Sequence, residues 1–96
     1  MGLFRFNLIR MYFLYIIYSA KLDKYYVGST ANINERISKH NTNHKGFTGT
    51  VNDWILKYYE EFSTKTEALK RELQIKKWKS SVRIKNLIAG SEHPDL

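Results

Sequence analysis

The chain contains no cysteine among its 96 residues. Disulfide bonds and thiolate metal sites are therefore excluded, and nothing in the composition argues for an oxidising compartment. The sequence also lacks internal repeats and any stretch typical of an interdomain linker. A chain of this length forms one domain with a modest hydrophobic core.

Long hydrophobic runs are missing as well. The stretch MYFLYIIYSA, which follows Arg10, superficially resembles the apolar region of a signal peptide. It is far too short to span a bilayer and is interrupted by Tyr12, Tyr15 and Tyr18. This pattern is typical of a strand that is buried on both faces. We therefore expect a cytoplasmic protein that does not insert into membranes.

Acidic residues are scarce relative to basic ones. Sixteen Lys and Arg against nine Asp and Glu give a net charge of +7. Such a charge favours polyanionic partners, nucleic acid first and an anionic membrane surface second. The alternative is a basic surface that only keeps the protein soluble. A hydrophobic content of 43% and an aromatic content of 15% indicate a packed globule rather than a disordered chain.

Apolar periodicity and turn residues predict a mixed order of elements. Strands are expected over 12–19, 24–29 and 54–62, helices over 31–41, 65–78 and 81–90, and a loop over 41–52. Asn32 with Glu35, and Thr64 with Glu67, fit capping boxes at two helix starts. Because a helix and a loop separate the second and third strands, we expect a small, mostly antiparallel sheet covered by helices, an α/β (α+β) fold.

The first two strands and the polar turn between them have the signature of a β-hairpin. Leu22-Asp23 is a poor two-residue turn compared with Asn-Gly, so a longer loop with another register stays open. With a two-residue turn at 22–23, Tyr26 would lie opposite Ser19. Side chains alternate with period 2, so Tyr15 and Tyr26 would point to the same face. Two phenols on one face are a candidate site, although tyrosines in small sheets more often serve as packing.

The junction between the second strand and the first helix has features of a phosphate site. Gly28 ends the strand and leaves room for a ligand or another backbone. Ser29 follows at the point where backbone N–H groups and the positive end of the helix could meet a phosphate. Arg36 and His40 are i,i+4 neighbours and share one flank of this helix.

Further basic residues are candidates for contacts with nucleic acid. His44 and Lys45 lie in the expected loop, where a solvated loop tip without a function is an equally good interpretation. A second basic group is formed by Lys76, Lys77 and Lys79, near the end of the 65–78 helix.

Glu72 does not fit the apolar face on which it is expected. With Leu69 set at 0° and about 100° per residue, Glu72 falls near −60°. A carboxylate on a core-facing side is costly unless it is paired, hydrogen-bonded or bound to a metal. Glu72 is therefore either a structural ion-pair partner, with Lys76 or Arg71 as local candidates, or a ligand that faces a cleft. The residues alone leave both interpretations open.

Two triplets of this chain resemble the paired signature of the GIY-YIG nucleases. The first ends at Tyr15, and the second begins at Tyr26 after ten intervening residues. The first triplet, FLY, keeps only its tyrosine, and the second, YVG, has Val for Ile. The family pattern has an arginine ten residues after the second tyrosine, which Arg36 matches. A histidine one turn later, matched by His40, occurs in part of the family. Glu72 matches the family's glutamate on a helix after the third strand.

The resemblance extends over about residues 12–90 and is closest to the small single-domain bacterial members. It implies a three-stranded antiparallel sheet flanked by helices, with a nuclease domain over 11–90. Residues 1–10 would be an N-terminal arm or a misassigned start, and 91–96 a polar tail. The implied partner is nucleic acid, DNA in the first place, in a repair or recombination role, with the protein acting as a monomer or weak dimer.

The resemblance also implies a metal-dependent endonuclease that hydrolyses phosphodiester bonds with one Mg²⁺ or Mn²⁺ ion. Glu72 would hold the ion, and Arg36 would contact the phosphate oxygens. Tyr26 is the first choice to orient or deprotonate the attacking water, with Tyr15 in support and His40 as the rival base. The alternatives are a nucleic-acid-binding module that kept the fold without cutting, and a protein-interaction domain.

Overall fold

The computed structural model describes residues 10–90. Its elements are β1 (Tyr12–Ser19), β2 (Lys24–Thr30), α1 (Ile33–His40), the 3₁₀ helix η2 (Phe47–Thr50), β3 (Ile55–Phe62), α2 (Lys65–Lys76) and α3 (Ser81–Ala89). The order matches the sequence prediction, with η2 inside the expected loop. The N-terminal arm up to residue 9 and the tail at 91–96 lie outside the described residues.

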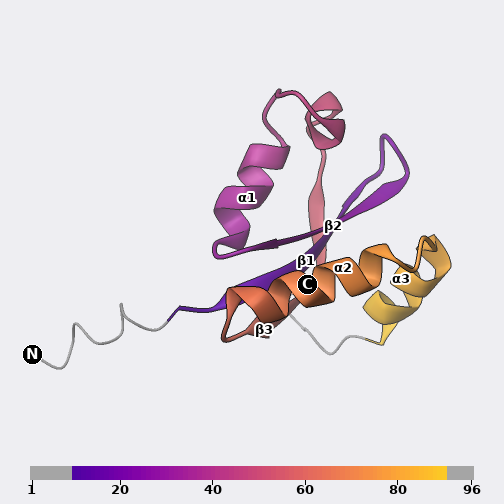
Figure 1. Ribbon diagram of the computed structural model, residues 1–96. Coiled ribbons are helices and arrows are strands. Elements are labelled where there is room, and N and C mark those ends of the chain that lie inside the picture. Colours follow the sequence, from indigo (N-terminus) through magenta and orange to yellow (C-terminus); the bar gives the residue numbers. More distant parts are fainter. Residues whose placement is uncertain (1–9, 91–96) are drawn as a thin grey trace, which may run out of the picture.

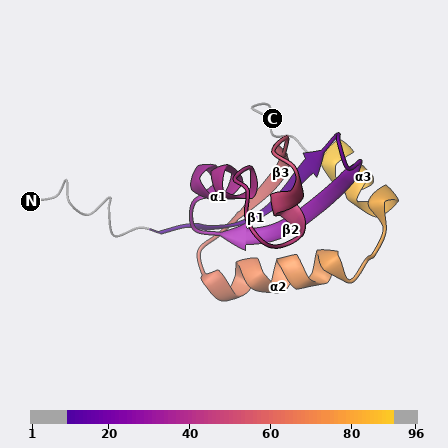
Figure 2. The same ribbon diagram turned by 90° about the horizontal axis from the view of Figure 1, so that it is seen from above.

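The three strands form one antiparallel sheet in the order β2-β1-β3. Helix α1 lies over one face of this sheet, and α2 and α3 lie over the other (Figure 1; Figure 2). The central strand β1 is therefore covered on both sides, and its residues 14–17 are all buried. The expected α+β fold, a three-stranded antiparallel sheet flanked by helices, is confirmed.

The hairpin between β1 and β2 has the longer of the turns that the sequence left open. Tyr26 pairs with Ile17, not with Ser19, because four residues separate the paired ends of the two strands. Asp23, within this turn, adopts a positive φ of 51°, which lets the chain reverse. The shift is an even number of residues. Tyr26 therefore still shares a face with Tyr15, as predicted.

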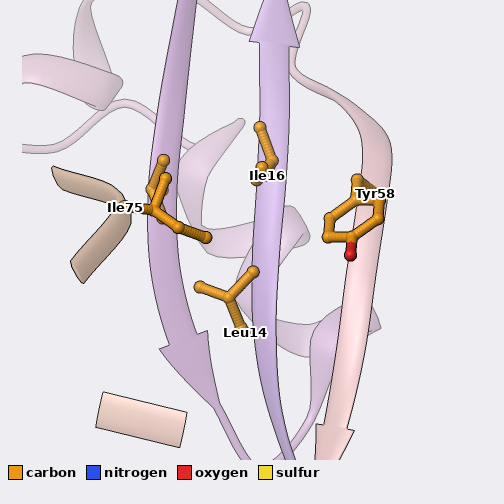
Figure 3. Packing of buried hydrophobic residues seen from close by; sticks show 5 residues of the cluster. Leu14, Ile16, Tyr58 and Ile75 are labelled. Carbon is orange, nitrogen blue, oxygen red and sulfur yellow. The ribbon is translucent and has the colours of Figure 1, made fainter. Parts of the chain in front are cut away.

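Alternate residues of β1 contribute to two separate hydrophobic clusters. On the side of α2 and α3, Leu14 and Ile16 pack with Ile75 and Tyr58 (Figure 3). On the side of α1, the buried cluster consists of Tyr15, Ile17 and Trp54. The sheet thus separates two small cores, and Tyr15 belongs to the one on the α1 side.

Both predicted capping boxes are confirmed at their N-caps. The side chain of Asn32 accepts a hydrogen bond from the backbone N–H of Glu35, and Thr64 accepts one from Glu67. Each cap satisfies a backbone donor that the first helical turn leaves without a partner. These local bonds fix where α1 and α2 begin.

The buried face of α2 differs from the one inferred from its leucines. Leu69 is 44% exposed and Leu73 is 49% exposed, whereas Ala68 and Ile75 are buried against the sheet. Ala68 and Ile75 are seven residues apart, two helical turns, and therefore lie on one face. The small Ala68 allows the helix to come close to the strands. Glu72 lies beside this face and is largely buried.

Candidate active site

Tyr15 reaches toward the edge of the sheet across Gly28. The two residues are paired in neighbouring strands. A Cβ atom at Gly28 would lie 2.5 Å from Cζ of Tyr15, well inside van der Waals contact. The space that the sequence suggested for a ligand at Gly28 is thus taken by the phenol of Tyr15.

The phenol of Tyr15 forms a hydrogen bond with His40, the last residue of α1. The distance from Oη to Nε2 is 2.7 Å. The ring of Tyr26 lies against both partners, with its centroid 4.9 Å from that of His40 and 6.5 Å from that of Tyr15. The three aromatic residues proposed for catalysis therefore form one cluster. Tyr15 and His40 are buried, and Tyr26 is only partly covered.

Burial determines the charge state of the Tyr15–His40 pair. Burial raises the pKa of Tyr15 well above its ordinary value, and Tyr26 raises it further, while the Arg36 guanidinium acts in the opposite direction. Burial lowers the pKa of His40 to about 4, with additional contributions from Arg36 and His44. Both side chains are therefore neutral near pH 7.

Arg36 lies one helical turn before His40, and its charge acts on both members of the pair. It lines a hollow of about 360 Å³ together with Arg10 and Lys65. It also lines a second hollow, of about 280 Å³, with Lys39, His40 and His44. Arg36 thus lines two hollows, each of which has further basic residues in its wall.

Glu72 is a compensated carboxylate. Ser29 Oγ donates a hydrogen bond to Oε1 at 2.6 Å, and Lys76 Nζ lies 2.7 Å from Oε2. The carboxylate side chain is 13% exposed and that of Lys76 is 42% exposed. Of the two partners considered from the sequence, Lys76 is confirmed. Arg71 instead makes a two-pronged contact with Glu60 on β3, at 2.9 and 3.0 Å.

Glu72 and Tyr15 approach β2 from opposite faces of the sheet. Gly28 and Ser29 are consecutive strand residues, so they face opposite sides. The phenol of Tyr15 covers Gly28 on the α1 side, and Glu72 binds Ser29 on the α2 side. Because β2 is an edge strand, both groups lie at the rim of the sheet.

Lys76 connects the two sides of this rim. Its ammonium pairs with Glu72 and lies 5.3 Å from the ring centre of Tyr26, the aromatic residue with the most access to solvent in the cluster. The five predicted catalytic residues are therefore arranged around the edge strand rather than on one face of the sheet.

The predicted basic residues are distributed unevenly around this rim. Lys76 and Lys79 line a hollow of about 400 Å³ that also includes Lys24 and Tyr26. His44 lines the hollow next to Arg36. Lys45 and Lys77 are exposed but line none of these three hollows.

Sequence reasoning missed several residues that the fold brings to the site. They are Arg10, Lys24, Lys39, Thr48 and Lys65. None belongs to a recognisable motif: Arg10 precedes β1, and the other four lie in four different elements. For the four basic residues the only signal in the sequence was the overall excess of positive charge, and for Thr48 there was none.

Comparison with known proteins identifies the protein family to which this fold and this site belong. Residues 11–86 match the GIY-YIG catalytic domain family. This match covers most of the chain, so the protein belongs to the GIY-YIG family.

The relatives are small bacterial proteins. The UPF0213 protein SH2523 of Staphylococcus haemolyticus is 37% identical over 76 residues, which cover 77% of this chain and 90% of that protein. The UPF0213 protein SERP0126 of Staphylococcus epidermidis is 36% identical over 81 residues, 82% of this chain and 96% of the relative. The UPF0213 protein DP2720 of Desulfotalea psychrophila is 37% identical over 83 residues, 84% and 74% of the two chains. No solved structure matches the chain.

The donor set at Glu72 is compatible with one hard cation. Within residues 10–90, His, Cys, Asp and Glu nowhere gather in threes as a metal-binding group. A carboxylate has about four acceptor positions, of which Ser29 and Lys76 use two. Mg²⁺ commonly binds through one carboxylate, with water and phosphate oxygens completing its shell.

Across the same described residues, none of the helices is both apolar and long enough to traverse a bilayer.

Proposed function

We propose that this protein is a metal-dependent endonuclease that hydrolyses phosphodiester bonds in DNA with one divalent cation. The observation that supports this most is the arrangement at the β2 edge. A neutral Tyr15–His40 pair lies on one side of the Gly28–Ser29 step, and an anchored carboxylate lies on the other. The carboxylate of Glu72 keeps acceptor positions beyond the two that Ser29 and Lys76 use, and a domain that only binds nucleic acid would not need these positions.

Arg36 is the group that binds the phosphate. Its planar fork of donors matches two phosphate oxygens and stabilises the extra negative charge that develops on phosphorus. The flanking hollows lined by Arg10 and Lys65, and by Lys76 and Lys79, supply positive charge for the phosphates on either side.

Tyr26 is the group that meets the attacking water, because it is the partly exposed phenol of the cluster. In its phenolate form it takes the proton of the water as the oxygen bonds to phosphorus and the ester bond breaks. The Lys76 ammonium, 5.3 Å from the ring centre, stabilises the negative charge on this phenol. Tyr15 and His40 pack against the ring of Tyr26 and hold it in place.

Glu72 would hold the divalent cation, Mg²⁺ or Mn²⁺, after its contact with Lys76 loosens. Lys76 is the more exposed partner and has a long side chain, so its ammonium can leave the carboxylate while it stays beside the ring of Tyr26. Such a cation supplies positive charge to the phosphate oxygens and to the departing alkoxide. Ser29 keeps the carboxylate oriented through its hydrogen bond to Oε1.

The direct test is to incubate the pure protein with supercoiled, linear, branched and single-stranded DNA in Mg²⁺ or in EDTA. We expect nicking or cleavage of at least one substrate in Mg²⁺ and none in EDTA. DNA binding without cleavage in Mg²⁺ or Mn²⁺ would instead support a non-catalytic nucleic-acid-binding module. The pairing of Glu72 with Lys76 is the observation that favours this second function.

A further inference from the structure

A chain of hydrogen bonds leads from Tyr15 through His40 to the surface. His40 Nδ1 lies 2.8 Å from Thr48 Oγ1 in η2. The same hydroxyl lies 3.1 Å from His44 Nε2, and His44 Nδ1 lies 2.6 Å from the backbone oxygen of Thr42. Thr48 is buried and His44 is exposed. The buried pair of the site is therefore connected to the loop that follows α1.

The chemistry of each group gives this chain a direction. A carbonyl oxygen only accepts, so His44 Nδ1 carries a proton toward Thr42. In uncharged His44 the other nitrogen is then a bare acceptor, and it takes the hydroxyl proton of Thr48. With its single proton used, Thr48 Oγ1 accepts from His40 Nδ1–H. His40 Nε2 is left without a proton and accepts from Tyr15.

We propose that Thr48 and His44 are positioning residues that hold His40 as its Nδ1–H tautomer, so that Tyr15 donates its phenol proton to His40 Nε2. The function of this arrangement rests on the proposed nuclease activity. With its proton turned to His40, the Tyr15 oxygen offers acceptor lone pairs to its other polar neighbour, Arg36. In the opposite tautomer His40 would donate to Tyr15, and the phenol proton would then have to point away from His40.

Thr48 is held firmly enough to perform this role. Its backbone oxygen accepts a hydrogen bond of 2.9 Å from the buried indole of Trp54. Asn41, at the end of α1, bonds to both the N–H and the carbonyl of Trp54, at 2.8 and 3.1 Å. These bonds close the loop between α1 and β3 on itself. The position of the hydroxyl is thus fixed by the same core that buries Tyr15.

The test is the tautomer of His40, read from the ¹⁵N chemical shifts of its ring in the full chain without nucleic acid. We expect the Nδ1–H form in the natural protein and in Thr48→Ser, which keeps the hydroxyl. Thr48→Val has nearly the same shape but no acceptor, so we expect His40 to change to the Nε2–H form. His44→Ala, at an exposed position, frees the Thr48 proton to turn to His40 and should raise the Nε2–H fraction. An Nε2–H form in the natural protein would overturn the proposal.

Nicking kinetics provide the functional half of the test. We expect Thr48→Val to lower kcat at least tenfold with KM for DNA nearly unchanged, and Thr48→Ser to restore kcat. An unchanged kcat in a Thr48→Val protein whose His40 tautomer has changed would overturn the positioning role. If the natural protein cuts no DNA, the proposed function fails, and the spectrum alone still decides for or against the tautomer. If Thr48→Val does not fold, the natural protein and His44→Ala decide in the same way.

Discussion

Replacing Glu72 by glutamine keeps the shape of the side chain and removes its charge. The amide oxygen can still accept from Ser29, but the ion pair with Lys76 is lost. Because Lys76 is 42% exposed, this pair contributes at most about 1 kcal/mol. Exchanging a charged acceptor for a neutral one at Ser29 costs about 1 kcal/mol more. We therefore expect a loss of about 1–2 kcal/mol in the free energy of unfolding, measured with urea in EDTA.

The expected loss of activity is much larger than this loss of stability. A neutral amide binds a divalent cation poorly, so nicking of supercoiled DNA in Mg²⁺ should fall on the order of a hundredfold or more. The matched control is Glu67→Gln, which lies on the same helix and raises the net charge equally, from +7 to +8 (7 + 1). Glutamine can replace glutamate in the capping contact with Thr64, so this control should remain stable and active.

Two outcomes would refute this reasoning. A folded Glu72→Gln protein that nicks DNA at a near-normal rate would remove Glu72 from catalysis. A loss of about 4 kcal/mol or more would show that the carboxylate is mainly structural, since breaking a buried pair has that cost. In that case the lost activity would follow from unfolding.

Three other changes test separate parts of the site. Arg36→Ala should lower the cleavage rate on the order of a hundredfold with little change in melting temperature. The control Lys70→Ala removes the same charge from an exposed position that lines none of the hollows, so it should retain activity. Equal effects of the two changes would argue against a phosphate contact specific to Arg36. Gly28→Ala should destabilise the protein by about 1–3 kcal/mol and reduce cleavage, because the new Cβ displaces the Tyr15 phenol. In the control Gly90→Ala the new Cβ meets only ordinary contacts, so this change should be nearly neutral in urea unfolding. A Gly28→Ala protein as stable as the natural one would contradict the packing described. The pKa of His40 is lowered to about 4, so the unfolded chain binds a proton more readily than the folded protein between pH 6.5 and 4. The free energy of unfolding should therefore fall as the pH falls through this range, by about 2 kcal/mol between pH 7 and 5. His40→Gln should lack this part of the slope, and parallel stability curves for the two proteins would refute the shift.

Much of the local structure followed from the sequence because the interactions that create it act over a few residues. Capping by Asn32 and Thr64 fixed two helix starts, and alternation placed Tyr15 and Tyr26 on one face of the hairpin. The i,i+4 spacing of Arg36 and His40 put them on one flank of α1. The resemblance to the GIY-YIG family, carried by a handful of residues at set spacings, was confirmed by the family match.

Tertiary structure decided the rest, because it depends on how elements turn and pack. Helical periodicity does not determine how α2 is rotated about its axis. Its contact with the sheet buries Ala68 and leaves Leu69 exposed, and it brings Glu72 to Ser29. The contact of Thr48 with His40 likewise exists only because the loop closes through Trp54. Sequence order alone could therefore propose the catalytic residues, but only packing places them on the two sides of the β2 edge.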